Sequence, residues 1–289
     1  MNIKSTLVRV FRYITKGVPV NNVTANIIEL TPSKLLEGRT ALVTGGTTGI
    51  GYEIAKACLK AGSNVVITGR DNERIEKACE SLKQLTGNNN IEGLVIDNIE
   101  VSSFRDKVKE AVGMFGKLDI LVNNAGVLTY DTISTESQEK YDQVLDTNLR
   151  GPFFLSQQVG SYMIENKIKG NILNVGSSSC LRPAVSAYTV SKWGIRGLTL
   201  GLARSLSPYG ITVNGIAPGQ TLTAMVKNHE SIDNLYRANI PLGRYILPEE
   251  IGNMAVILVS DMGRAVIGDI VYMTGGAGVI TYEDMNYKF

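Results

Sequence analysis

Short apolar runs alternate with longer stretches of helical hydrophobic periodicity from Arg39 to near the end of the chain. The apolar runs predict seven strands: Ala41–Thr44, Asn64–Thr68, Leu94–Asp97, Ile120–Asn123, Asn171–Val175, Ile211–Ile216 and Ile270–Met273. Their richness in Val, Ile and Leu is typical of strands that are buried on both faces. The stretches between them predict helices at Ile50–Lys60, Asp71–Leu85, Ser102–Phe115, Gln138–Glu165 and Ala187–Leu206. The alternation therefore predicts one α/β domain, in which helices cover both faces of a parallel sheet.

The first 38 residues lie outside this alternation. Basic residues surround four apolar residues that fall at helical spacing: Leu7, Val10, Phe11 and Ile14. With no acidic residue before Glu29, this pattern predicts a basic amphipathic helix. We favour an arm packed on the domain or on a neighbouring subunit over contact with a membrane surface, a targeting segment or a disordered segment. The expected organisation is an arm over residues 1–38 and a single domain with a C-terminal tail over residues 39–289.

Composition argues against several classes of function. The 29 basic and 27 acidic residues leave a formal charge of +2, which gives no reason to expect a nucleic-acid partner. Cys58, Cys79 and Cys180 lie far apart without metal-ligand spacing, so neither a disulfide framework nor a metal site is indicated. No apolar run approaches the ~20 residues that a membrane span needs. We therefore expect a cytoplasmic protein with reduced thiols.

The first predicted strand runs directly into a glycine-rich turn, Thr44–Gly51, and a helix follows at once. Glycines allow the sharp turn and let backbone amides approach a pyrophosphate, while the helix N-terminus offers unpaired N–H groups. Glycines in such a turn often serve backbone conformation alone. A glycine-rich turn placed between a strand and a helix, however, favours the prediction of a dinucleotide-binding site. The candidate cofactor-binding residues of this turn are Gly45, Thr47, Thr48, Gly49, Ile50 and Gly51.

The second predicted strand ends just before Arg70, at a place where an enzyme selective for NAD usually carries an acidic residue. A basic side chain there favours the 2′-phosphate of NADP(H), so we expect NADP(H) to be preferred, with NAD(H) as the alternative. The neighbouring Asp71 could bind a ribose hydroxyl, but its position before a helix favours an N-cap. Arg70 could also be a solvated surface residue.

Two further strand ends contribute candidate cofactor ligands. At the third strand, Asp97 could accept a hydrogen bond from the adenine amino group or could cap a helix, and Asn98 follows it. The fourth strand ends in Asn123-Asn124-Ala125-Gly126. Small and amide residues at the carboxyl end of a strand suit close passage of the chain beside a nucleotide. We therefore add these candidates: Asp97, Asn98, Asn124, Ala125 and Gly126.

A second pattern concerns proton transfer. Tyr188 and Lys192 are four residues apart in a predicted helix, so their side chains project from one face. Upstream, the strand Asn171–Val175 opens into a run of serines that begins at Ser177. A parallel α/β sheet brings this strand end and the start of that helix beside the nicotinamide end of the cofactor site. The pair is therefore a candidate acid and base.

These motifs, taken in order, resemble those of the short-chain dehydrogenase/reductase family in its single-domain branch, with 3-oxoacyl reductases and gluconate dehydrogenases among the similar members. The likeness spans Leu36 to Gly276 and is carried by Thr44–Gly51, Asn123–Gly126, Tyr188-x-x-x-Lys192 and Pro218-Gly219. It implies a Rossmann-like, doubly wound sheet with strand order 3-2-1-4-5-6-7. It also implies a catalytic tetrad of Asn148, Ser177, Tyr188 and Lys192. Further cofactor contacts are expected from Tyr188, Lys192, Pro218, Gly219, Thr221 and Thr223.

The resemblance implies a role for each member of the tetrad. Tyr188 exchanges a proton with the substrate oxygen, which requires a pKa well below the usual ~10 of tyrosine. The ammonium group of Lys192 is placed to supply that lowering. Ser177 would polarise the substrate carbonyl, and Asn148 would position a water that links Lys192 to solvent. Hydride passes between the substrate carbon and the cofactor, so no metal is required.

The choice of Ser177 over Ser178 and Ser179 rests on aligning Asn174-Val175-Gly176-Ser177 with the end of the corresponding strand in the family. The loop from Ser177 to Tyr188 is shorter than in relatives, so the three serines remain alternatives. We expect Cys180 to line the pocket or to pack beneath it. A catalytic role for His229 and a redox role for Cys180 are not favoured, and Trp193 is most simply a packing residue.

The expected function is the NADP(H)-dependent interconversion of a small carbonyl and a secondary alcohol. The leading substrate classes are 3-oxoacyl thioesters and sugars or polyols. Tyr209 weakens the first, because acyl-carrier-protein reductases that resemble the chain commonly have a basic residue there. A non-catalytic, nucleotide-sensing regulator on the same fold is the alternative. The intact Tyr188 and Lys192 argue against it.

The resemblance also implies a homotetramer, with a dimer as the alternative. Two predicted helices carry more apolar residues than one buried face needs. In the first these are Val144, Leu145, Phe153, Phe154 and Val159; in the second, Val190, Trp193, Ile195, Leu198, Leu200 and Leu202. The arm over residues 1–38 could instead cover these faces within one chain.

Overall fold

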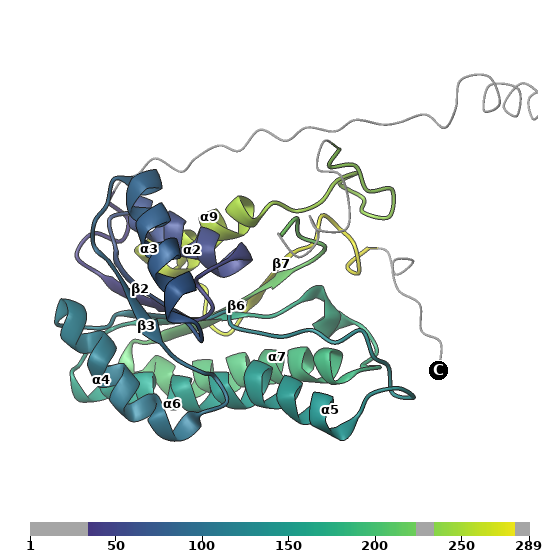
Figure 1. Cartoon of the computed structure of the whole chain (residues 1–289), viewed down its shortest axis with the longest axis horizontal. Coiled ribbons are helices and arrows are strands. Elements are labelled where there is room, and N and C mark those ends of the chain that lie inside the picture. Colours follow the sequence, from purple (N-terminus) through teal and green to yellow (C-terminus); the bar gives the residue numbers. More distant parts are fainter. Residues whose placement is uncertain (1–33, 224–233, 281–289) are drawn as a thin grey trace, which may run out of the picture.

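A computed structural model describes residues 34–223 and 234–280 of the chain. Its centre is a seven-stranded sheet in which every pair of neighbouring strands is parallel (Figure 1). The strands are β1 (Thr40–Val43), β2 (Asn64–Gly69), β3 (Ile91–Val95), β4 (Ile120–Asn123), β5 (Asn171–Val175), β6 (Thr212–Pro218) and β7 (Ile270–Met273). Their order, β3-β2-β1-β4-β5-β6-β7, confirms the predicted topology.

Two strands have a bound that differs from the prediction by two residues or more, while the bounds of β1 and β2 differ by one residue. β3 begins at Ile91 and ends at Val95, so Asp97 lies beyond the strand rather than at its end. β3 is an edge strand in which only Ile91 and Leu94 are buried, so the search for a continuous apolar run missed its first half. β6 begins at Thr212 and continues to Pro218, which brings the predicted Pro218-Gly219 motif directly to the strand end.

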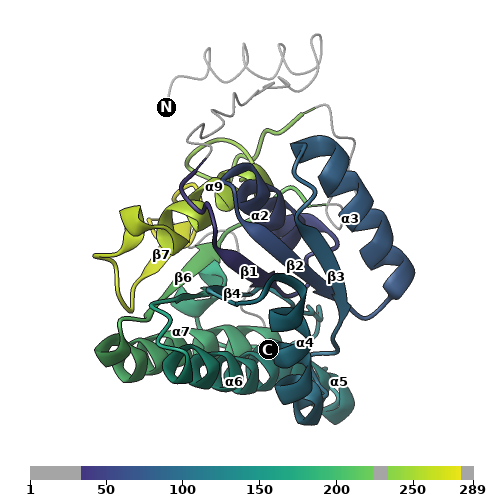
Figure 2. The same cartoon turned by 90° about the vertical axis from the view of Figure 1, so that its left-hand side faces the viewer.

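Helices cover both faces of the sheet, as Figures 1 and 2 show. One face carries α2 (Gly49–Lys60), α3 (Asn72–Thr86) and α9 (Pro248–Val259), and the other carries α4 (Phe104–Phe115), α6 (Gly151–Glu165) and α7 (Ala187–Leu206). A further helix, α5 (Gln138–Leu145), precedes α6. Because helices bury both faces, the strands between them had to be apolar on both sides.

The stretch Gln138–Glu165, predicted as one helix, is divided by a π-helical turn at Asp146–Arg150. Pro152 follows this turn and has no N–H to donate to the carbonyl of Asn148, so the regular hydrogen-bond ladder is interrupted there. π-helical turns inside helices often occur at functional sites. Here the turn contains the predicted catalytic residue Asn148.

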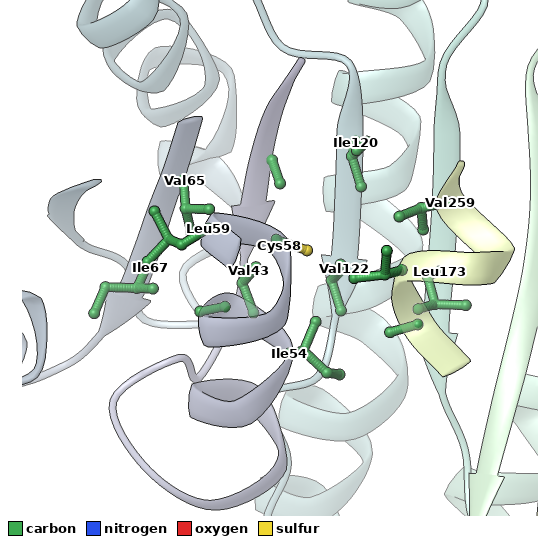
Figure 3. Packing of buried hydrophobic residues seen from close by; sticks show 14 of the residues in the cluster. Val43, Ile54, Cys58, Leu59, Val65, Ile67, Ile120, Val122, Leu173 and Val259 are labelled. Carbon is green, nitrogen blue, oxygen red and sulfur yellow. The ribbon is translucent and has the colours of Figure 1, made fainter. Parts of the chain in front are cut away.

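The core consists of two apolar layers, one on each side of the sheet. Alternate residues of each strand point to opposite layers: Val43 of β1 packs beneath Ile54 and Cys58 of α2, whereas Leu42 faces α4 and α6. Figure 3 shows the first layer, in which the side chains of β1, β2, β4 and β5 meet α2 and α9. Each fully buried aliphatic side chain contributes about 1.5–3 kcal/mol, so the two layers fix the sheet against its helices.

Packing of the domain begins before the expected boundary at residue 38. Leu36 is buried in the first layer, and its N–H donates to the carbonyl of Ala61 over 2.9 Å. The predicted amphipathic helix lies in residues 1–33, outside the described residues, so the division into arm and domain stays a prediction. None of the helices within residues 34–223 and 234–280 has the length and apolarity needed to cross a membrane.

Candidate active site

A cavity of about 730 Å³ opens at the carboxyl ends of the strands. This edge of a doubly wound sheet is where ligands bind in such folds, and the volume is that of an ordinary ligand site. Nearly all of the predicted site residues line it: Gly45, Thr47, Thr48, Gly49, Ile50, Arg70, Asp97, Asn98, Asn124, Ala125, Gly126, Ser177, Tyr188, Lys192, Pro218, Gly219, Thr221 and Thr223. Gly51 and Asn148 are the predicted residues that do not.

Backbone geometry explains the glycines of the turn. Gly45 and Gly49 have φ angles of 62° and 59°, in the left-handed region that favours glycine. A Cβ atom on Gly51 would collide with the carbonyl of Gly45 and the side chain of Asn124. Gly51 thus lets the turn close against Asn124, although it does not line the cavity. Thr48, the N-cap of α2, makes no side-chain capping bond, so nothing from its side chain occupies the helix N-terminus.

Asn124 serves the turn more than the cavity. Its side-chain amide donates to the carbonyls of Thr44 and Gly45 over 2.9 and 3.1 Å. The Thr44 hydroxyl accepts from the backbone N–H groups of Asn124 and Ala125 in return, over 2.9 and 3.0 Å. These bonds connect the turn after β1 to the segment after β4. The side-chain nitrogen of Asn124 uses its two N–H groups for the two carbonyls of the turn.

Three charged side chains lie at the second strand end: Arg70, Asp71 and Arg74. Asp71 accepts a hydrogen bond from the N–H of Arg74 over 3.2 Å, which confirms it as the N-cap of α3. Arg70 is exposed and lines the cavity. Arg74 lines it as well, which the sequence reasoning missed. Its place in the first turn of α3, one helical turn after the N-cap, could have indicated it.

The third strand end presents one polar group that has no partner. Asn98 is 5% exposed, and its side-chain nitrogen Nδ2 is buried without a hydrogen bond. A buried donor of this kind costs about 1–3 kcal/mol unless a ligand or water accepts from it. The Asp97 carboxylate accepts from the N–H of Ile99 over 3.2 Å, so it orders a local turn and caps no helix.

An elongated dinucleotide fits this cavity. The glycine-rich turn, the open helix N-terminus, two arginines and the unsatisfied amide of Asn98 lie along it.

Tyr188 and Lys192 lie in the first two turns of α7 and both line the cavity. The helix begins at Ala187 with a capping box, in which Ser186 and Thr189 satisfy each other's backbone N–H groups. Lys192 is buried, and its ammonium nitrogen donates to the carbonyl of Val175 over 3.0 Å. The same nitrogen lies 5.5 Å from the centre of the Tyr188 ring.

The pKa values differ from the expectation that Lys192 lowers that of Tyr188. Burial raises the pKa of Tyr188 above 10, and a hydrogen bond with Ser177 opposes this only in part. Burial lowers the pKa of Lys192 to about 8. The Lys192 ammonium group is bonded to the carbonyl of Val175 and lies beside the tyrosine ring, and burial dominates the pKa of both residues. The positive ring of an oxidised nicotinamide, when bound, would act in the lowering direction on Tyr188.

Ser177 is the one of the three candidate serines that lines the cavity. It follows β5 and is the N-cap of a short 3₁₀ helix, Ser178–Leu181, where its oxygen accepts from the N–H of Ser179 over 3.1 Å. Cys180 is fully buried outside the lining, with its sulfur 3.7 Å from the hydroxyl of Tyr272. It therefore packs beneath the site.

The Asn148 side chain makes three hydrogen bonds. Its oxygen accepts from the N–H of Val127 over 2.8 Å, and its nitrogen donates to the carbonyl of Val127 and the hydroxyl of Ser191 over 2.9 and 3.2 Å. The oxygen has a second lone pair, which could still accept from a water, so the predicted role of Asn148 in positioning a water stays a prediction. What Asn148 visibly does is hold the start of the loop after β4 against α7.

Other residues singled out in the sequence have simpler places. The indole N–H of Trp193 donates to the carbonyl of Arg182 over 2.7 Å, while 41% of the residue stays exposed. Trp193 thus ties α7 to the segment after Ser177 in addition to packing. His229 lies outside the described residues. Within residues 34–223 and 234–280, no group of three or more His, Cys, Asp or Glu side chains could hold a metal ion.

Comparison with known proteins places the chain in a family. The model of the short chain dehydrogenase family matches residues 39–233. A 3α-hydroxysteroid dehydrogenase of Mediterraneibacter gnavus is 36% identical over 84% of this chain and 98% of its own length. A 3-oxoacyl-[acyl-carrier-protein] reductase of Aquifex aeolicus is 33% identical over 83% of this chain and 98% of its own.

Solved structures agree with this placement. A candidate gluconate dehydrogenase from Agrobacterium tumefaciens superposes with a TM-score of 0.79 at 30% identity, covering 85% of this chain and 98% of the other. A variant of actinorhodin polyketide ketoreductase with NADPH gives a TM-score of 0.76 at 32% identity, covering 83% and 97%. The chain is a member of the short-chain dehydrogenase/reductase family, an NAD(P)-binding oxidoreductase that acts on CH–OH and C=O groups.

Proposed function

We propose that this enzyme uses NADP(H) to interconvert a neutral carbonyl compound and a secondary alcohol, with Tyr188 as acid and base. One observation carries the proposal: Tyr188, Lys192 and Ser177 line the same cavity as the glycine-rich turn. The cavity therefore offers a dinucleotide site and a proton-transfer group in one continuous space. A dinucleotide laid along the turn has its nicotinamide end beside Tyr188.

The residues of the substrate end have separate roles in this proposal. In the reductive direction Tyr188 gives its phenolic proton to the substrate oxygen, and in the oxidative direction it takes one. Ser177 donates a hydrogen bond to the same oxygen and stabilises the charge that develops on it. Lys192 holds a positive charge beneath the tyrosine ring. The bound nicotinamide supplies or accepts the hydride.

The preference for NADP(H) rests on charge at the second strand end. Arg70 and Arg74 both line the cavity there, and the nearest acidic residue, Asp71, is used as the N-cap of α3. Two guanidinium groups suit a 2′-phosphate, whereas a ribose hydroxyl would be bound by a free carboxylate. A polyketide ketoreductase of similar structure was solved with NADPH. NAD(H) remains the alternative cofactor.

The substrate end favours a neutral, partly apolar substrate. Val127 and Leu128 line it, and Lys192, already bonded to Val175, is the charged lining residue closest to Tyr188 in the described part of the chain. A 3-oxoacyl thioester or a similar bulky ketone fits these walls better than a sugar acid, whose carboxylate would need its own cation. Sugars and polyols without charge are the second class. The exposed Tyr209 gives an acyl carrier protein no basic contact.

Assembly as a homotetramer in the cytoplasm completes the proposal. Several of the apolar residues noted in the sequence are buried within the chain, including Val144, Val159 and Ile195. Others on α6 and α7 stay 37–54% exposed: Phe153, Val190, Trp193 and Leu200. A second copy of the chain is the occupant that we propose for this face. Light scattering that gives the mass of one chain, 31.3 kDa, at micromolar concentration would contradict it.

The function is tested by following NADPH consumption by the purified enzyme with a panel of carbonyl compounds. The panel holds 3-oxoacyl thioesters, bulky ketones including steroids, uncharged sugars and gluconate-type acids. We expect turnover with at least one neutral ketone, a preference for NADPH over NADH, and little turnover of the acids. No turnover with any compound in either direction, together with intact NADPH binding, would favour the non-catalytic regulator instead.

A further inference from the structure

Residues 127–137, in the loop between β4 and α5, are attached to the catalytic helix α7 at both ends of this segment. At its start Val127 is held by two hydrogen bonds to Asn148, whose side chain also reaches Ser191 of α7. At its end Glu136 contacts α7 directly. The first attachment uses a residue of the expected tetrad. The second uses a residue that no part of the proposed mechanism has assigned.

The Glu136 carboxylate makes two hydrogen bonds with its two oxygens. Oε1 accepts from the hydroxyl of Thr129 over 2.9 Å, and Oε2 accepts from the backbone N–H of Ala187 over 3.1 Å. Ala187 is the first residue of α7 and directly precedes Tyr188. Glu136 is half-buried, so solvent only partly competes for these bonds.

The first turn of α7 has a place for such an acceptor. Ser186 accepts from the N–H of Thr189 with its side chain and from that of Val190 with its carbonyl, and α7 has no acidic residue in its own first turn. The N–H of Ala187 is not satisfied by this capping box. A carboxylate contributed by the loop both accepts from it and interacts favourably with the positive end of the helix dipole.

We propose that Glu136 is a positioning residue for Tyr188: it fixes the start of α7, and hence the phenolic hydroxyl, against the loop that carries Leu128 into the cavity. Leu128 precedes Thr129, the other partner of Glu136, so the same carboxylate sets a wall of the substrate end relative to the proton donor. A displacement of ~1 Å between reacting groups can lower turnover about 100-fold. This inference rests on the proposed function of Tyr188.

Two substitutions separate the hydrogen bonds from the charge. In Glu136→Gln the amide oxygen can accept from Ala187, and the amide nitrogen can donate to the Thr129 hydroxyl. Both bonds are kept while the charge is lost. In Glu136→Ala both bonds are lost. Asp131→Ala is the matched control, because Asp131 lies in the same loop but pairs with Lys140 of α5 over 2.8 Å.

The three variants and the wild-type enzyme are compared with NADPH and the best carbonyl of the panel. We expect Glu136→Ala to lower kcat about 10- to 100-fold with the Kd for NADPH unchanged. Glu136→Gln and Asp131→Ala should stay within about threefold of wild type, and the midpoint of the pH profile should be that of wild type in Glu136→Gln. Thermal unfolding of each variant shows whether it is folded.

Amide hydrogen exchange of the holoenzyme provides a readout that does not need turnover. Exchange at Ala187 should be faster in Glu136→Ala than in wild type, and unchanged in Glu136→Gln. Equal kcat in wild type and Glu136→Ala, equal losses in all three variants, or unchanged exchange at Ala187 would each overturn the positioning role. Absence of turnover in the wild-type enzyme itself would overturn the proposed function, and the exchange rates would still decide whether Glu136 holds Ala187.

Discussion

The two halves of the cavity are built in different ways. The nucleotide half is formed by backbone: the turn from Thr44 to Gly51, where glycines adopt left-handed or crowded conformations next to a helix N-terminus. The substrate half is formed by side chains that join distant segments, such as Glu136 and Ala187, which are 51 residues apart. A backbone conformation that needs glycine restricts the residues that a position tolerates. A side-chain hydrogen bond, in contrast, can be made by many pairs of residue types. The halves should therefore respond differently to substitution.

The largest expected effect on cofactor affinity is in the nucleotide half. Gly51→Ala places a methyl group against the Gly45 carbonyl and the Asn124 side chain, so the turn must open. We expect NADPH and NADH to lose affinity together, by about 100-fold or more, which corresponds to ~2.8 kcal/mol. Isothermal titration with both cofactors measures this. Gly113→Ala is the control, since that exposed position in α4 has open space around it. Unchanged affinity in Gly51→Ala would mean that cofactor binding does not depend on the backbone geometry of the turn.

A smaller effect is expected from a side chain in the same half. Arg70→Ala should weaken NADPH about 10- to 100-fold and leave NADH nearly unchanged, because a charge-assisted hydrogen bond contributes about 1.5–3 kcal/mol and only NADPH has the 2′-phosphate. Paired titrations of the two cofactors decide this. An equal loss of affinity for both cofactors would show that Arg70 does not bind the 2′-phosphate, and there would then be no reason to prefer NADP(H) over NAD(H).

The smallest effect concerns a pair outside the cavity lining, in which Arg244 bonds to Glu250 in the first turn of α9. Its two guanidinium nitrogens donate to the carboxylate over 2.7 and 3.0 Å, and the pKa of Glu250 lies below its ordinary 4.5 because of this arginine. A lowered folded-state pKa means that the pair stabilises the fold above pH 4.5 and that this contribution disappears as the pH falls through the folded-state value.

Glu250→Gln should therefore lower the free energy of unfolding by about 1 kcal/mol at neutral pH. Denaturant titrations from neutral to acidic pH test this, and the gap between variant and wild type should close only below pH 4.5. A gap that stays constant into strong acid would show that the charge of Glu250 is not the source of this stability. Catalysis should change little, since neither residue lines the cavity.

The comparison also explains what could be predicted from the sequence. The strands themselves, the glycine turn, the place of Arg70 after a strand and the pair Tyr188 and Lys192 follow from hydrophobic period, glycine placement and helical spacing, all of which are local patterns. The strand order was implied by the family resemblance. The π-helical turn at Asp146–Arg150 was missed because its cause, Pro152, gives no change in apolar pattern. β3 was misplaced because this edge strand is partly exposed and begins with Ile91-Glu92-Gly93, which is not a continuous apolar run.

The rest of the site depends on contacts that no local pattern contains. The partners of Asn148 and Glu136 become known only when the loop after β4 lies beside α7. The position of the Lys192 ammonium, bonded to Val175 rather than to the tyrosine hydroxyl, depends on the depth at which α7 packs against β5. Spacing predicted that the two side chains share a face, and burial determined their pKa values.

The central claim is that cofactor binding and proton transfer reside in separate halves of one cavity, and Tyr188→Phe tests it most directly. The substitution removes the phenolic hydroxyl and keeps the ring against Lys192. With NADPH and the best carbonyl of the panel, we expect kcat to fall about 10²- to 10⁴-fold, while the Kd for NADPH stays at the wild-type value. A variant that keeps more than about a tenth of wild-type kcat would contradict the role of Tyr188 as acid and base.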